Sequence, residues 1–485
     1  MEHRRRWWTL AAITAATFMP YLDNNIVNVA LPTIQRDLGL TTAGLEWVVS
    51  GYILVFASLM LAGGRLADVY GRRRLFLAGI ATFTVASLLA GLSADGAILI
   101  LSRAVQGVGA ALLVPIGLAL LPAAFPDERE RGLAVGIWSG VGALSLALGP
   151  LAGGFISEQW HWGWIFLINV PIGVLAYTLS AAVIRECRVT RTRRRLDLPG
   201  MALSAVTLFT VTYVLIEGDS QGWTSPRMLV LFIIAIVAAV LFVVAEAHSV
   251  DPMIDVRLLR DRVFVGGTLA LGLWAFGVFG IYFFSALYLQ NVLGFSPVKA
   301  GITFVPMAIA TAVFAAVSGP IAQRLGTHRT VAGALALMAL ALLGVASVGG
   351  NGSVAELMPW ILAYGVGAGL IVPLTATILN LLPAERESVA SGVLNVSREV
   401  FGLLGVTVLG AVLGARQSAQ EGHGVPPLQA FLSGYQLALV FAAAILAVGV
   451  PVSLRALRAT RTPNPAPQRP DAPLQTPTEQ LVPSN

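Results

Sequence analysis

The fold is constrained most by a series of apolar stretches, each about 20 residues long, with only short polar connections between them. A helix of ~20 residues spans the ~30 Å hydrocarbon core of a bilayer and satisfies its own backbone hydrogen bonds. Fourteen such stretches are present, at about 7–30, 45–63, 75–93, 97–121, 132–156, 164–184, 196–216, 228–247, 263–289, 300–323, 331–348, 357–379, 389–415 and 429–454. The sequence therefore predicts an all-α polytopic membrane protein.

The composition excludes a soluble protein. Hydrophobic residues make up 56% of the 485-residue chain and charged residues 12%, whereas a soluble domain carries about 25% charged residues. The net charge of +6 comes from basic residues in short connections beside apolar stretches, so we expect no nucleic-acid partner. The single cysteine, Cys187, excludes an internal disulfide and a cysteine-based metal cluster. Because no phosphate-binding loop, zinc motif or nucleophile elbow is present, we expect no enzyme, no metal and no cofactor.

The basic residues also predict the orientation. If the N-terminus is cytoplasmic, most of the 31 Lys and Arg residues lie in cytoplasmic connections, as the positive-inside rule requires. The exceptions are Arg36, Arg227, Lys299 and Arg416 in outer connections and Arg103 and Arg398 within spans. Both termini are then expected to be cytoplasmic.

A repeat divides the chain. The stretch 319–326 is similar to 64–71 at an offset of 255 residues, and 365–368 is similar to 107–110 at an offset of 258. Because these offsets are too long for six helices placed back to back, we interpret the seventh and eighth spans as an insertion. The predicted parts are a six-helix half, two inserted helices with flanking basic loops, a second six-helix half and a disordered tail, at 1–184, 185–262, 263–458 and 459–485.

One connection carries a recognisable motif. Gly64-Arg65-Leu66-Ala67-Asp68-Val69-Tyr70-Gly71-Arg72-Arg73-Arg74 resembles the loop signature of the major facilitator superfamily. An ordinary positive-inside loop would explain the arginines but not the spacing of Gly and Asp. We expect a tight cytoplasmic hairpin in which Asp68 caps the next helix or pairs with an arginine, and the resemblance implies a gating loop formed by Gly64, Asp68, Gly71 and Arg72.

With fourteen spans, the chain resembles the drug:proton antiporter branch of that superfamily. The resemblance implies a major facilitator fold and proton-driven efflux of lipophilic drugs or antibiotics by alternating access across the bacterial cytoplasmic membrane. The expected partners are a lipophilic small molecule, protons and membrane lipids, and the expected state is a monomer. A proton-coupled uptake symporter and a non-transporting membrane sensor remain as alternatives. Phe18, Tyr52, Trp138, Trp274 and Tyr282 are aromatic candidates for lining an apolar cavity.

Asp23 lies within the first span, where an acid persists only if it faces a cavity, finds a partner or titrates. The stretch 22–32, which includes Asn28, resembles the first-helix motif of the fourteen-span branch. We predict that Asp23 is the main proton or cationic-substrate site. The alternative is an interfacial aspartate that caps a helix end.

Arg103 lies near the outer start of the fourth span, at about the depth of Asp23, so the two side chains are able to pair. Arg103 and Gln106 match the R-x-x-Q-G motif of the family, whose arginine is associated with proton coupling. The repeat counterpart of Arg103 is Ile361, so the arginine is not part of a shared scaffold. A structural arginine that reaches toward the interface is the alternative.

Glu399 and Arg398 stand near the middle of the thirteenth span. Neighbours in sequence point about 100° apart on a helix and need not pair with each other. We hypothesise that Glu399 is a second proton or cation site, and an ion pair with Arg398 or with another helix remains open.

The fifth span carries Gly149, Pro150, Gly153 and Gly154, which resemble the antiporter signature of the family. Small residues allow close helix packing, and the proline interrupts the backbone hydrogen bonding. The resemblance implies a role in the outer gate. A plain packing helix is the alternative.

Overall fold

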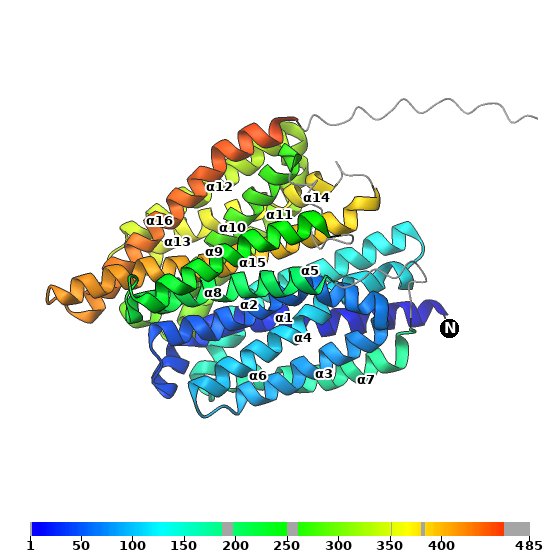
Figure 1. Ribbon diagram of the computed structural model, residues 1–485, viewed down its shortest axis with the longest axis horizontal. Helices are drawn as coiled ribbons and strands as arrows, with labels where there is room; N and C mark the ends of the chain where they lie inside the picture. Colours follow the sequence, from blue (N-terminus) through cyan, green and yellow to red (C-terminus); the bar gives the residue numbers. More distant parts are fainter. Residues whose placement is uncertain (1, 187–196, 250–259, 351, 380–383, 460–485) are drawn as a thin grey trace, which may run out of the picture.

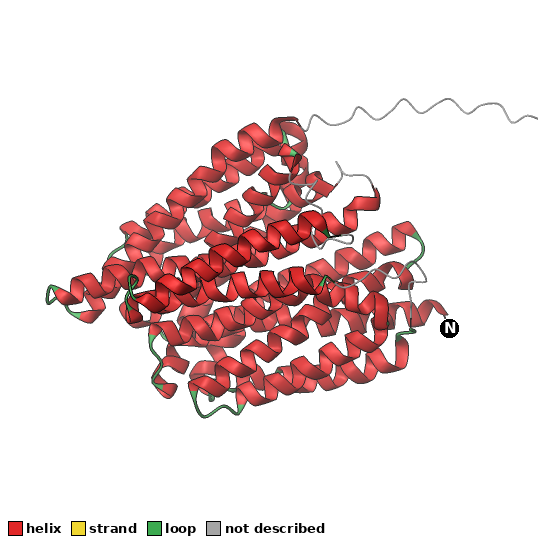
Figure 2. Cartoon of the chain, viewed as in Figure 1, coloured by secondary structure: helices red, strands yellow, loops and turns green. Residues whose placement is uncertain are grey.

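The computed structural model describes residues 2–186, 197–249, 260–350, 352–379 and 384–459. The elements of these residues are helices, with no strand among them (Figure 2). The predicted tail from residue 460 onward and most of the two basic stretches that flank the insertion lie outside the described residues. The four-part division of the chain therefore stays a prediction.

The helices follow the predicted spans, and most of them are longer. The first seven are α1 Glu2–Leu38, α2 Thr42–Tyr70, α3 Arg72–Gly91, α4 Gly96–Ala124, α5 Glu128–Gln159, α6 Trp164–Leu167 and α7 Asn169–Val183. The insertion contains α8 Leu198–Gln221 and α9 Pro226–His248. The remaining helices are α10 Arg262–Leu287 with a π-helical turn at Tyr288–Val292, α11 Pro297–Leu325, α12 Thr327–Ser347, α13 Val354–Leu370, α14 Pro373–Leu379, α15 Ala384–Gly422 and α16 Pro427–Ala456.

Thirteen spans in the described part of the chain are long and apolar enough to cross a membrane, with α6 joined to α7 and α13 joined to α14. The fourteenth is α1, which is 37 residues long and less apolar, and whose side chains from Ile13 to Ile34 are largely buried in the bundle. The predicted fold class is confirmed. The extra length lies at the ends, where polar side chains cap the helices beyond the apolar run; Thr41 and Ser296, for example, accept hydrogen bonds from the backbone of their first turns.

Each half is held together by pairs of packed helices. In the first half α1 packs against α5 and α7, and α4 packs against α2 and α3. In the second half α10 packs against α15, α11 against α13, and α12 against α16. The inserted helices α8 and α9 pack on each other, and α8 also contacts α2 and α15, so that it lies along the junction of the two halves (Figure 1).

The bundle has two distinct ends. We call the end at which residues 2 and 459 lie the terminal end, and the opposite end, with the α1–α2 connection, the distal end (Figure 1). At the distal end the halves are joined: Gln290 Nε2 donates to the Val29 carbonyl at 2.7 Å, and the Val298 amide donates to Glu158 Oε2 at 2.9 Å. Toward the terminal end, a Cβ atom added to α5 at Gly132, Gly136 or Gly140 would meet nothing within 4 Å. The described residues therefore close the seam distally and leave this face of α5 free near the termini.

Candidate functional site

Asp23 is fully buried in α1 and is held by donors from two other helices. Its Oδ1 accepts hydrogen bonds from Gln106 Nε2 of α4 and Asn169 Nδ2 of α7, each at 3.1 Å. Its Oδ2 is ion-paired with Arg103 Nη1 of α4. The structure thus brings Asp23, Arg103 and Gln106 together. A carboxylate at this depth is stable because three donors replace the water that it has lost.

Arg103 is also fully buried and has further partners. Its Nη1 donates to Gln106 Oε1 at 2.9 Å, and its Nε donates to the Val48 carbonyl at 3.0 Å. Its Cζ lies 4.4 Å from the centre of the Tyr52 ring, a favourable position for a cation. Two polar atoms of this cluster, Arg103 Nη2 and Asn169 Oδ1, have no hydrogen-bond partner among the described residues. The cluster therefore has capacity for a changed arrangement of hydrogen bonds.

A cavity of about 320 Å³ lies between the two halves. Tyr52 forms part of its wall and also stacks on Arg103, so it separates the buried cluster from the cavity. The cavity is mainly aromatic and apolar, with a few amide and hydroxyl groups, a composition typical of small-molecule sites. Its aromatic lining consists of Tyr21, Tyr52, Phe56, Trp138, Trp274, Phe279, Tyr282 and Tyr364.

Arg398 and Glu399 of α15 line the same cavity. Arg398 donates to Glu399 Oε1 from Nε at 3.1 Å and from Nη2 at 2.7 Å, and it is hydrogen-bonded to the Tyr21 hydroxyl of α1. Of the alternatives that the sequence left open, the structure shows the ion pair between neighbours. Their long side chains meet in the cavity although their Cβ atoms diverge. The titration of Glu399 stays a prediction.

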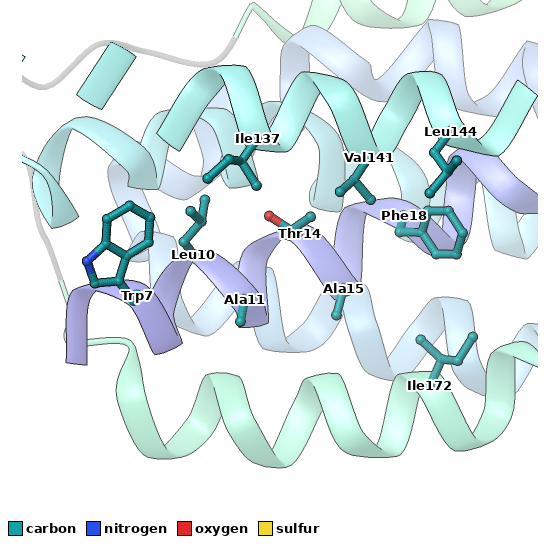
Figure 3. Close-up of a pocket in the computed structure, with 10 residues that line it drawn as sticks. All are labelled: Trp7, Leu10, Ala11, Thr14, Ala15, Phe18, Ile137, Val141, Leu144 and Ile172. Carbon is teal, nitrogen blue, oxygen red and sulfur yellow. The ribbon is translucent and has the colours of Figure 1, made fainter. Parts of the chain in front are cut away.

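An apolar groove of about 570 Å³ lies between α1, α5 and α7. Figure 3 shows Trp7, Leu10 and Phe18 of α1 facing Ile137 and Leu144 of α5 across it. Phe18 therefore lies in this groove and does not line the central cavity, in contrast to the other four aromatic candidates.

The motif between α2 and α3 forms a tighter turn than predicted. Residues 64–70 belong to α2, and the turn is made by Gly71 alone, whose φ of +106° is the left-handed region that favours glycine. Asp68 does not cap α3; its Oδ1 accepts from Arg72 Nη2 at 2.9 Å. Arg72 Nη1 also donates to the Ala119 carbonyl at 2.7 Å. The motif thus ties α2, α3 and α4 together.

Three glycines of α5, Gly149, Gly153 and Gly154, lie at the distal seam. Side chains at Gly149 and Gly153 would collide with α1 at Asn25 and Ile26, and a side chain at Gly154 would collide with the Pro297 carbonyl of α11. The carbonyl of Pro150 in turn lies against Gly301 of α11. These residues allow α1, α5 and α11 to approach to backbone contact.

One predicted site residue stands apart, and two members of the cluster, Asn169 and Ser87, are not among the predicted site residues, whereas Tyr52 was predicted for the cavity wall only. Asn28 donates to the Asn24 carbonyl within its own helix and does not contact Asp23 in any described hydrogen bond. Asn169, Ser87 and Tyr52 belong to the cluster, and Ser87 Oγ accepts from Gln106 Nε2 at 2.8 Å. A lone amide in an apolar span was the available signal for Asn169. Ser87 carries no such signal, since serine is common in membrane helices.

Known proteins that are similar in sequence to this chain are named for resistance to drugs or antibiotics. The chain is 35% identical over 451 residues to the puromycin resistance protein pur8 of Streptomyces alboniger, covering 91% of this chain and 89% of the relative. It is 34% identical over 413 residues to the tetracenomycin C resistance and export protein of Streptomyces glaucescens, covering 85% of this chain and 77% of the relative. It is 36% identical over 418 residues to the multidrug resistance protein Stp of Mycobacterium tuberculosis, covering 86% and 78%.

The fold has solved counterparts. A bacterial homologue of the human lysosomal transporter Spinster, in its inward-facing and unoccupied conformation, superposes with a TM-score of 0.67 at 16% identity, covering 94% of this chain and 97% of that chain. The family model of the Major Facilitator Superfamily matches residues 13–406. Family match, fold and relatives agree with the resemblance that the motifs carried, and the chain belongs to the major facilitator superfamily.

Proposed function

We propose that the protein is a proton-driven exporter of lipophilic drugs or antibiotics that works by alternating access. The observation that carries the proposal is Tyr52, which lines the central cavity and stacks on Arg103, the ion-pair partner of Asp23. A change at the buried carboxylate therefore reaches the cavity through a single side chain. The relatives are named for resistance to puromycin, tetracenomycin C and several drugs, which supports an outward direction.

Coupling follows from the charges of the cluster. Protonation of Asp23 removes the negative charge that holds Arg103, and the guanidinium, which does not lose its proton, must then seek other acceptors. Its stacking on Tyr52 changes with it. A proton on Asp23 and a lipophilic substrate in the cavity then favour different positions of Tyr52 in the cavity wall. Coupling requires that the two ligands bind different arrangements of the protein with different affinities.

The cavity suits a lipophilic substrate with a small number of polar groups. Aromatic rings from both halves supply apolar contact, while Asn25, Ser145 and the Arg398–Glu399 pair supply hydrogen-bonding partners. A cationic compound would be attracted by Glu399 only after Arg398 is displaced, since Arg398 neutralises that carboxylate.

The proposed setting is the bacterial cytoplasmic membrane, with both termini cytoplasmic and the chain acting as a monomer surrounded by lipid. In that orientation the distal end is the outer side, and the packed distal seam corresponds to an inward-facing state. The proton gradient is the energy source, and no cofactor is required.

The test measures drug-driven proton release from inverted vesicles. The release is monitored as the dequenching of a pH-sensitive dye, and puromycin and ethidium are the drugs added. We expect dequenching with the native chain and none with Asp23→Asn. Glu421→Gln, an exposed acid hydrogen-bonded to Gln417, is the control and is expected to behave like the native chain. Substrate-driven proton flow in the opposite sense would favour an uptake symporter, and the absence of any signal across a broad panel would favour a sensor.

A further inference from the structure

A second buried carboxyl lies at the distal end of the bundle, outside the cluster around Asp23. Glu46, in the second turn of α2, is 4% exposed. Its Oε2 has no hydrogen-bond partner among the described residues. A buried carboxylate oxygen without a donor is rare, because the lost hydration is not replaced. Neither the cavity nor the proposed mechanism uses this side chain.

Glu46 lies where three parts of the chain meet. Its carboxyl group packs directly on the backbone of α15 at Gly410, where a methyl group would collide with it. On another side it faces Glu217 of the inserted helix α8, which is close enough to act on it electrostatically. The contact thus joins the first half, the second half and the insertion.

The two carboxyl groups have opposite surroundings. Glu217 Oε1 accepts from Trp47 Nε1 at 2.9 Å, and its Oε2 accepts from Ser220 Oγ at 3.1 Å and from Gln221 Nε2 at 3.4 Å. Glu217 is also partly exposed. Glu217 thus has three donors and access to solvent, whereas Glu46 is buried beside it with an oxygen that has no donor among the described residues. Where two neighbouring acids differ in this way, one proton is held by the poorly solvated group.

We propose that Glu46 is a proton-binding site whose protonation allows α2 and α15 to pack against each other and close the distal end. A neutral carboxyl group can be buried against Gly410 at modest cost, but a carboxylate there would be buried unpaired next to the negative charge of Glu217. Closure therefore requires a proton. When α2 and α15 separate, Glu46 meets water and returns to the ordinary behaviour of a glutamic acid, which is ionised at neutral pH.

The charged groups on the elements packed against α2 do not offer Glu46 a positive partner. Asp219 of α8 accepts from Ser418 of α15 at 2.6 Å, and Arg103 of α4 is committed to Asp23. Among the described helices, Glu217 of α8 acts on Glu46 electrostatically, and Asp219 of α8 lies near Gly414 of α15. Tyr213 of α8 packs on Trp47 and accepts a hydrogen bond from Arg227 of α9, and Arg416 of α15 donates to Ser433. The balance of charge near Glu46 is thus negative.

This inference deepens the proposed function, because it adds a proton site on the side from which protons would enter. In the proposed orientation, a proton taken up from the outside by Glu46 would close the outer side and return the transporter to its inward-facing state. The inserted helix α8 then contributes to coupling, because Glu217 makes the closed state dependent on that proton.

The test measures the conformation of the distal end and not transport. A failure of the Glu46 proposal can therefore be distinguished from a failure of the proposed drug export. Spin labels are placed at Ala94, in the connection between α3 and α4, and at Ala419 of α15, both exposed at the distal end. The full-length chain carries Cys187→Ser as background. Pulsed electron paramagnetic resonance then gives the distance distribution in detergent from pH 5 to pH 9.

We expect the shorter, closed distances to increase as the pH falls in the native chain. In Glu46→Gln, which keeps the shape of the neutral acid, the closed population should be the same at pH 9 as at pH 5. In Glu217→Gln, removal of the neighbouring charge makes ionised Glu46 less unfavourable in the closed state, so the closed population at pH 9 should rise and the midpoint of closure should move to higher pH. Glu421→Gln should titrate like the native chain.

A native distance that does not change with pH would overturn the proposal, as would a Glu46→Gln variant that titrates like the native chain. A purely structural Glu46 would leave the midpoint of Glu217→Gln unchanged, and that result also overturns it. If Glu46→Gln does not elute as a folded protein in gel filtration, the shift in Glu217→Gln decides the question by itself.

Discussion

Replacing Asp23 by asparagine is expected to cost more stability than removing its partner Arg103. In Asp23→Asn the guanidinium of Arg103 stays fully buried without its counter-ion, and it is unable to lose its proton. Breaking a buried pair in this way costs about 3–5 kcal/mol. The remaining contacts of Arg103 to the Gln106 Oε1, the Val48 carbonyl and the Tyr52 ring place the expected cost near the lower value, about 3 kcal/mol.

The substitution of the other member of the pair, Arg103→Met, leaves Asp23 with the amide donors of Gln106 and Asn169. Asp23 is able to take up a proton and become neutral, so we expect a smaller cost, about 1–2 kcal/mol, from the unpaired acceptors that remain. The double variant contains no buried charge at this site. It should be more stable than Asp23→Asn alone, with a coupling energy of about 2 kcal/mol between the two positions.

The assay is unfolding in mixed micelles by titration with sodium dodecyl sulfate, followed by far-ultraviolet circular dichroism, for the native chain, both single variants and the double variant. Equal costs for the two single variants would refute the asymmetry between a carboxyl group and a guanidinium. Additive costs in the double variant would refute the energetic importance of the pair itself.

Two further predictions concern the seam and the cavity. Gly154→Leu should collide with the Pro297 carbonyl, hold the distal seam open and abolish transport. Gly140→Leu on the same helix meets nothing within 4 Å in this state and should leave the distal seam closed. The spin-label distances described above compare the two variants, and equal distances would contradict the steric argument. Glu399→Gln should abolish proton-linked transport if Glu399 binds a proton, because a neutral amide neither binds nor releases one; unchanged dye dequenching would show that Glu399 serves only to pair with Arg398.

The helices were predictable because the bilayer imposes a length and an apolar composition on each span. Their bounds were less so: Asp68 and Arg72 look like loop residues in the sequence, yet α2 continues to Tyr70, since a single glycine at position 71 suffices for the turn. The pairing of Asp23 with Arg103 was suggested by their equal depth in the membrane, because side chains at the same depth on two helices of one bundle are able to meet.

The rest depends on rotation of the helices about their axes, which composition does not determine. Asn169 joins the cluster because α7 presents that face to α1, and Ser87 joins it because α3 presents that face to α4. Glu46 was absent from the predicted site because its position near the start of a span is typical of an exposed interfacial acid, and its burial against Gly410 becomes visible only when α15 is in place.

The described members of the cluster around Asp23 come from helices of the first half: Asp23 itself from α1, its direct partners from α4 and α7, and the residues that contact those partners from α2 and α3. A rocking motion of one half against the other can carry such a group of residues as one piece, so the rocking itself breaks no bond within it. Within the cluster, the proton that Asp23 gains or loses is the proposed cause of change. The motion changes the side of Tyr52 that faces the central cavity, because the second half of the chain lines that cavity too.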